Sequence, residues 1–118
     1  MNINLYQYKA LVTKVYDGDT ITVEVDLGFQ TYVKGEKIRL NRINTPEVRG
    51  DSREEGLKSR DYLRTVILNK EILLETVRDK KGKYGRYLGE VFYKQENGEW
   101  LNMNNDLVNK GFAEFKEY

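Results

Sequence analysis

Strict alternation of apolar and polar residues is the feature that most limits how this chain can fold. Apolar side chains occupy every second position from Ile21 to Leu27, with threonine, glutamate and aspartate between them. Successive side chains of a strand point to opposite faces, so this pattern predicts a half-buried strand at 21–27. Residues 10–16 predict an earlier strand. The Asp-Gly-Asp sequence at 17–19 predicts the hairpin between them, where glycine permits a tight turn.

The period of the pattern changes after a third strand, predicted at residues 37–43 beyond a long loop at 28–35. Ser52 is followed three residues later by Glu55, which is a capping box and a start signal for a helix. Apolar residues at spacings of three and four continue this helix to residue 68. Two more strands are predicted at 71–77 and 87–93, and a short helix at 104–110 ends at Gly111.

The order of these elements predicts the fold class. The chain has 118 residues, which fits one domain, and we expect that domain to span residues 1–118. Three strands, a helix, two strands and a helix predict a mainly β fold with helices, of the α+β class. The specific expectation is a five-stranded OB-fold Greek-key barrel with two to three helices. Another small α+β sheet is the alternative that the pattern leaves open.

The chain contains no histidine and no cysteine, which excludes several kinds of active site. Ser-His-Asp and Cys-His nucleophiles, zinc sites with His or Cys ligands, and disulfides all need these residues. Catalysis must therefore use carboxylates, arginine, lysine, tyrosine or a hard metal ion. No apolar run approaches the roughly 18 residues of a membrane span, and the first residues do not resemble a signal peptide. We expect no membrane partner, a monomer, and a cytoplasmic location unless the chain is a processed, secreted form.

The net charge of +1 conceals two basic segments. Residues 37–64 carry eight basic and five acidic side chains, and residues 78–89 carry five and one. Such segments can concentrate an anionic ligand, although solvated lysine-rich loops have the same composition. Three short sequences stand out beside this charge: Asp-Gly-Asp-Thr at 17–20, a run from arginine to Thr-Pro-Glu at 39–47, and Lys-Tyr-Gly-Arg at 83–86. Each alone is typical of a turn or a strand end.

Together, the three sequences supply the groups that phosphodiester hydrolysis needs. Oxygen atoms of Asp19 and Asn44 suit a hard cation such as Ca²⁺. Glu47 can accept a proton from an attacking water or position that water. Arg39 and Arg86 carry planar guanidinium groups that match phosphate oxygens bidentately. None of these roles requires histidine.

The same sequences, in this order and within this strand pattern, resemble the staphylococcal nuclease (thermonuclease) family. The resemblance runs from about residue 10 to residue 113. It implies an OB-type barrel and a Ca²⁺-dependent enzyme that hydrolyses DNA and RNA and leaves 3′-phosphate ends. By resemblance, Asp19 and the carbonyl of Thr45 are metal ligands, and Glu47 acts on the attacking water. The remaining matches are Arg39 and Arg86 on the phosphate, and Lys83 and Tyr84 at the nucleotide site.

One departure from the family pattern affects the metal. Asn44 stands where the family has its second metal-binding aspartate. An amide oxygen can still coordinate Ca²⁺, but one negative charge is lost, and we expect metal binding to weaken by about 10- to 100-fold. The alternative is a catalytically degenerate domain that binds nucleic acid or protein. The loop at 27–36 is expected to be extended and to contact substrate or a partner.

Overall fold

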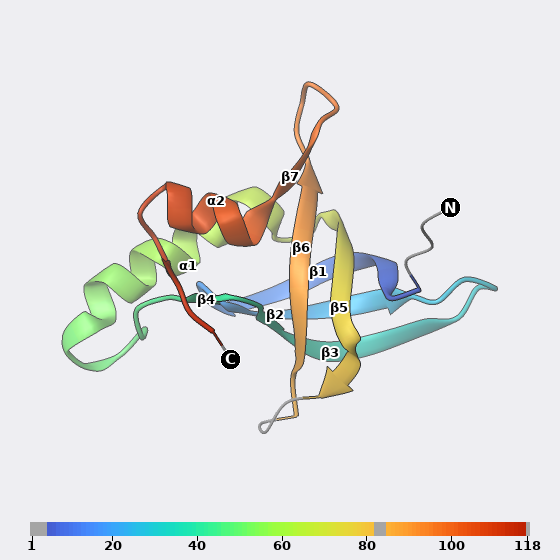
Figure 1. Cartoon of the computed structure of the whole chain (residues 1–118), viewed down its shortest axis with the longest axis horizontal. Coiled ribbons are helices and arrows are strands. Elements are labelled where there is room, and N and C mark those ends of the chain that lie inside the picture. The colour runs from blue at the N-terminus through green and yellow to red at the C-terminus, as the bar shows by residue number, and fades with distance from the viewer. Residues whose placement is uncertain (1–4, 82–84, 118) are drawn as a thin grey trace.

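The computed structural model describes residues 5–81 and 85–117, with the side chains of 78–81 excepted (Figure 1). Eleven elements follow one another in these ranges. The strands are β1 (Gln7–Asp17), β2 (Thr20–Asp26), β3 (Tyr32–Leu40), β4 (Ile43–Asn44), β5 (Glu71–Lys81), β6 (Tyr87–Lys94), β7 (Trp100–Asn102) and β8 (Glu114–Phe115). The helices are the short 3₁₀ turn η1 (Gly50–Ser52), α1 (Arg53–Ile67) and α2 (Met103–Asn109).

Five strands form a closed barrel. Antiparallel pairing gives the order β3-β2-β1-β5-β6, and a parallel pairing of β3 with β6 joins the two edges. In that closing pair Ile38 lies opposite Tyr87 and Arg39 lies opposite Leu88. The structure confirms the predicted mainly β fold, a five-stranded OB-type barrel with two α-helices.

The alternating pattern fills the barrel as the sequence predicts. Ile21 and Val23 are fully buried, and Val25 is nearly so, whereas the residues between them face outward. Helix α1 covers one end of the barrel and contributes Leu63 and Ile67 to the same core. Among the described residues, no helix is long and apolar enough to cross a membrane.

A buried amide helps to hold helix α2 against the barrel. The side chain of Asn104 is fully buried and donates to the carbonyl oxygens of Asn41 and Gly89, at 2.9 and 3.0 Å. Its own oxygen accepts a hydrogen bond from the backbone N–H of Val91 at 3.1 Å. All three partners belong to β6 or to the turn after β3, so this amide fixes α2 against the end of β3 that carries Arg39.

The prediction of a long loop at 28–35 is wrong. Strand β3 already begins at Tyr32, and only a tight turn separates it from β2. Gly35 adopts a φ of +72° beside a register shift between Val23 and Val25, so the strand contains a bulge where the sequence pattern breaks. The third strand also ends at Leu40, and a turn at 41–42 separates it from the short strand β4.

Two local predictions about helix α1 and the later strands need correction. The side chain of Ser52 makes no capping hydrogen bond to the helix, and instead its hydroxyl donates to the carbonyl of Glu47 at 3.2 Å. A 3₁₀ turn leads into the helix, so the capping box does not form. The short strands β7 and β8 were not predicted, because two or three residues are too few to show an alternating pattern. The predicted end at Gly111 is confirmed by its φ of +84°.

Candidate active site

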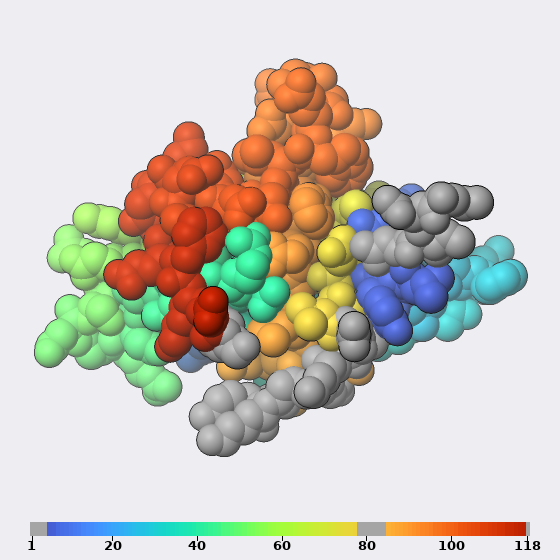
Figure 2. All heavy atoms as spheres, in the orientation of Figure 1, coloured from blue at the N-terminus to red at the C-terminus, as the bar shows by residue number. Residues whose placement is uncertain are grey.

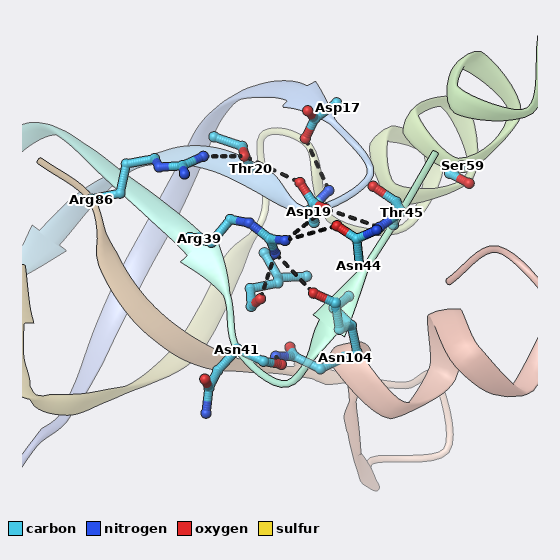
Figure 3. Close-up of polar contacts among 12 residues, drawn as sticks. Asp17, Asp19, Thr20, Arg39, Asn41, Asn44, Thr45, Ser59, Arg86 and Asn104 are labelled. Carbon is cyan, nitrogen blue, oxygen red and sulfur yellow. Dashed lines mark hydrogen bonds and ion pairs between the residues drawn. The ribbon is translucent and has the colours of Figure 1, made fainter. Parts of the chain in front are cut away.

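The Asp-Gly-Asp turn between β1 and β2 lies directly against helix α1 (Figure 3). A Cβ atom at Gly18 would lie 2.8 Å from Cβ of Ser59 and 2.8 Å from Cγ2 of Thr45. Gly18 is therefore needed for close packing. The sequence suggested that it was needed for the geometry of the turn, but its φ is not positive, so the turn itself does not require glycine. This contact places the turn beside the segment that follows β4.

Asp19 is the centre of the polar cluster in Figure 3. Its carboxylate is buried, and Oδ2 accepts a hydrogen bond from the backbone N–H of Thr45 at 3.0 Å. The same Oδ2 lies 3.2 Å from Nη2 of Arg39. Oδ1 accepts a hydrogen bond from the hydroxyl of Thr20 at 3.3 Å. Asp19 thus joins the start of β2 to the residues just beyond β4.

Asp17 places a second buried carboxylate next to Asp19. Its Oδ1 accepts a hydrogen bond from the backbone N–H of Asp19 at 3.0 Å. Burial, followed by repulsion from the Asp19 carboxylate, raises the pKa of Asp17 to about 6. The sequence interpretation treated this residue as part of a turn, although its place in the same Asp-Gly-Asp sequence could have indicated the pair.

Arg39 connects the cluster through four hydrogen-bonding contacts. Nη1 donates to the carbonyls of Leu40 and Ile43, at 2.8 and 3.1 Å, which fixes the plane of the guanidinium group. Nη2 donates to the amide oxygen of Asn44 at 3.3 Å and pairs with Asp19. The arginine is 8% exposed, so its charge is held in place beside both side chains.

Asn44 and Thr45 supply the oxygens that adjoin Asp19. Asn44 is exposed, and β4 pairs with β8 so that Asn44 lies opposite Glu114. The buried hydroxyl oxygen Oγ1 of Thr45 has no hydrogen-bond partner among the described residues. A carboxylate, an amide oxygen and an unpartnered hydroxyl form an all-oxygen donor set, which is the chemistry that Ca²⁺ prefers. Within residues 5–81 and 85–117, no three acidic side chains gather as a metal cluster.

Arg86 reaches the cluster from the start of β6. Its Nη1 donates to the hydroxyl of Thr20 at 3.2 Å, and Thr20 in turn donates to Asp19 (Figure 3). The guanidinium group is half-buried, so part of it faces solvent. The structure therefore brings Arg86 to the same side of the barrel as Arg39, although 46 positions separate them in the sequence.

Glu47 is held through its backbone, while its side chain is exposed. A Cβ atom at Gly56 would lie 2.1 Å from the carbonyl oxygen of Glu47 and 2.9 Å from that of Pro46. Only glycine at this position of α1 lets the segment after Thr45 lie against the helix. The sequence interpretation missed Gly56, although a single glycine inside a helical pattern is a signal of close packing.

The predicted site residues have different outcomes in the structure. Asp19, Arg39, Asn44, Thr45 and Arg86 lie in one connected cluster, and Glu47 follows directly from it. Lys83 and Tyr84 lie outside the described residues. Ser59, which the sequence interpretation did not mention, donates from its hydroxyl to the carbonyl of Phe112 at 2.8 Å. It ties the helix behind the site to the segment after α2.

Comparison with known proteins gives a consistent result. A family model described as staphylococcal nuclease homologue matches residues 37–118. The endonuclease YhcR of Bacillus subtilis is 34% identical over 91% of this chain and 9% of its own length. The thermonuclease of Staphylococcus hyicus is 31% identical over 99% of this chain and 63% of its own length. An uncharacterised protein of Methanocaldococcus jannaschii is 31% identical over 90% of this chain and 58% of its own length. The chain thus spans less than two thirds of each of these relatives.

Proposed function

The chain belongs to the staphylococcal nuclease family, and from that premise we propose that it is a Ca²⁺-dependent nuclease. The reaction is hydrolysis of phosphodiester bonds in DNA and RNA, with 3′-phosphate ends as products. The family match and the relatives named as nucleases support nuclease activity in general. The Ca²⁺ requirement and the 3′-phosphate products rest on the resemblance and on the oxygen donors at the site.

The observation that carries this proposal is the position of Arg39. Its guanidinium group lies between the carboxylate of Asp19 and the amide of Asn44, and Arg86 approaches the same place through Thr20. Two fixed positive charges beside an oxygen donor set suit the developing charge of a phosphate under attack. Groups that are oriented before the reaction cost no reorganisation during it.

We assign the roles of the site residues as follows. Asp19 and the amide oxygen of Asn44 would hold the cation together with an oxygen of Thr45, which is the carbonyl by resemblance and to which the unpartnered hydroxyl adds a second donor. Bound there, Ca²⁺ supplies positive charge that stabilises the phosphate oxygens in the transition state. Glu47 accepts the proton of the attacking water or orients that water. The two arginines, Arg39 and Arg86, stabilise the negative charge on phosphorus-bound oxygens. Lys83 and Tyr84 are assigned to the nucleotide by resemblance alone.

The test is a paired titration of the natural chain and its Asn44→Asp variant with Ca²⁺. Release of acid-soluble nucleotides from DNA and RNA is measured over a range of Ca²⁺ concentrations and in excess chelator. We expect the aspartate variant to need about 10- to 100-fold less Ca²⁺ for half-maximal rate, because it regains one negative charge. The product ends are checked with a polymerase. A 3′-phosphate end is extended only after a phosphatase has removed the phosphate. Release that is independent of metal, or no release even by Asn44→Asp, would contradict the proposal.

A second candidate function follows from Asn44 itself. A site with an amide where the family has a carboxylate is what a degenerate, non-catalytic binding module would contain. If the chain is such a module, the natural chain hydrolyses no nucleic acid. Glu47→Gln would then leave its affinity for an oligonucleotide unchanged. For the nuclease, Glu47→Gln removes turnover while affinity persists. The pair of measurements separates the two functions.

A further inference from the structure

The turn between β2 and β3 presents an aromatic side chain to solvent. The backbone N–H of Thr31 donates to the carbonyl of Gly28 at 2.9 Å, which closes a turn whose two central residues are Phe29 and Gln30. Both have left-handed backbone conformations, with φ of +53° and +61°, although neither is glycine. Phe29 is fully exposed, at 103%. The hairpin extends to the right-hand edge of the molecule (Figures 1 and 2), so its turn lies away from the helices.

The outer face of the same hairpin leads to the candidate active site. Thr20 and Thr22 flank the inward-facing Ile21, so both belong to the outer face of β2, where Thr20 is covered by its neighbours and Thr22 is half-buried. Thr20 lies opposite Arg39 and Thr22 lies opposite Lys37 in the pairing with β3. Arg86 lies directly before β6, which pairs with β3, and it donates to the hydroxyl of Thr20. The exposed Lys37 therefore lies next to the buried Arg39 and the half-buried Arg86 on this side of the barrel.

This surface continues along β3 toward the turn with further cationic and aromatic side chains. Lys34 has a side chain 80% exposed, and its Nζ lies 3.9 Å from Glu24 on the same face. Tyr32 is 53% exposed and lies opposite Asp26, which in turn lies opposite Lys9 of β1. From Arg39 to Tyr32 the strand spans about 23 Å at roughly 3.3 Å per residue.

We propose that the outer face of this hairpin, from Lys37 to Phe29, binds a single strand of nucleic acid that continues from the active site. Phe29 and Tyr32 stack on bases, and Lys34 and Lys37 contact phosphates. Two exposed rings near the turn, followed by two lysines toward the active site, suit a strand that has both a charged backbone and flat bases, because stacking and charge act at separate points along it. The inference rests on the proposed function, since the strand it describes is the substrate of that site.

The tests use binding in chelator, where no Ca²⁺-dependent hydrolysis takes place. Anisotropy of a fluorescent 16-nucleotide single strand gives the dissociation constant for the natural chain and for three variants at Phe29. We expect Phe29→Ala and Phe29→Leu to bind about 5- to 100-fold more weakly, and Phe29→Trp to bind as the natural chain does. Trp100→Ala is the matched control, because it removes a 54% exposed aromatic ring from β7, which is not part of this face.

The lysines are tested through the dependence of binding on salt. Replacing Lys34 and Lys37 with glutamine should lower the slope of log affinity against log salt by about 1.4, because each phosphate contact on a single strand contributes about 0.7. An unchanged slope would show that these lysines do not contact phosphates of the bound strand. Equal affinity for Phe29→Ala and the natural chain, or for Phe29→Leu and the natural chain, would overturn stacking at the turn and indicate a protein surface instead.

Hydrolysis of the same strand in Ca²⁺ separates failure of this inference from failure of the proposed function. If the strand is hydrolysed and Phe29→Ala does not change the Michaelis constant, the result supports the proposed nuclease and contradicts binding at the hairpin. If the affinity depends on Phe29 but the strand is not hydrolysed in Ca²⁺, the result supports binding at the hairpin and contradicts the proposed nuclease. The natural chain failing to bind the strand at all would overturn the surface.

Discussion

Replacing Gly56 with alanine tests how rigidly helix α1 holds Glu47. The added Cβ would lie 2.1 Å from the carbonyl oxygen of Glu47 and 2.5 Å from its carbonyl carbon. Ordinary contact begins near 3.4 Å, so the backbone of Glu47 must move by about 1 Å. The obstructing atoms are backbone, and no side-chain rotation relieves them.

Two opposing effects decide how stable Gly56→Ala is. Alanine favours a helix over glycine by about 1 kcal/mol, which would stabilise the protein. Forcing a methyl group into a filled space costs about 1–3 kcal/mol, and the upper part of that range applies where backbone must move. We expect a net loss of about 1–2 kcal/mol in the free energy of unfolding. Misplacement of Glu47 by about 1 Å should also lower the rate by about 100-fold.

Urea unfolding and nuclease rate at saturating Ca²⁺ measure the two effects separately. Thr65→Ala is the control, because Thr65 is exposed on the same helix and its hydroxyl bonds only within it, to the carbonyl of Asp61. It should gain a few tenths of a kcal/mol in stability and leave the rate unchanged. A Gly56→Ala variant that is more stable than the natural chain and equally active would refute the reasoning. Lower stability with an unchanged rate would show that α1 does not position Glu47.

Three further changes have distinct expected outcomes. Arg86→Lys should lower the maximal rate at least about 10-fold, because one ammonium group does not replace a guanidinium fork; a full rate would exclude bidentate phosphate binding. Asn104→Leu should cost about 2–4 kcal/mol in urea unfolding, since it removes the bonds of Asn104 to the N–H of Val91 and to the carbonyl of Asn41, while the carbonyl of Gly89 keeps its bond from the N–H of Asn41; a loss below about 1 kcal/mol would contradict this. The raised pKa of Asp17 means that folding takes up a proton between about pH 4 and pH 6, so in chelator the free energy of unfolding should fall as pH rises through that range. Asp17→Asn should remove this fall, and a variant that keeps it would assign the titration to another group.

Most of the barrel could be predicted because its pattern is strict. Every second residue of β2 is buried, and a half-buried strand leaves that alternation in the sequence. The pattern fails at β3, where Gly35 forms a bulge and shifts the register by one residue. A bulge reverses the inward and outward positions, so the first part of β3 resembled a loop. For the same reason, the alternating pattern did not indicate the hairpin turn at Phe29.

The site was only partly predictable, for a related reason. Short motifs indicated Asp19, Arg39 and Arg86 as chemical groups, and their local sequences do not depend on packing. The contact of Gly18 with Ser59 and that of Gly56 with Glu47 depend on how α1 lies across the barrel end, which no local pattern specifies. Glycine in a helix interior costs stability, so its presence there indicates a contact, but the partner of that contact comes only from the three-dimensional structure.

Asn44 changes the charge balance of the site as well as its metal affinity. Asp19 pairs with Arg39, Asp17 lies next to Asp19, and Arg86 reaches the same cluster through Thr20, so two carboxylates and two guanidinium groups already occupy the site before any cation binds. A carboxylate at residue 44 would stand where the amide oxygen now lies, 3.3 Å from Nη2 of Arg39, and would add a third negative charge. Without a cation that charge is attracted by Arg39 and repelled by the other two carboxylates, whereas bound Ca²⁺ would attract it as well. Addition of Ca²⁺ should therefore raise the unfolding temperature of Asn44→Asp by more than that of the natural chain, and an equal rise in the two chains would contradict a role for residue 44 in holding the cation.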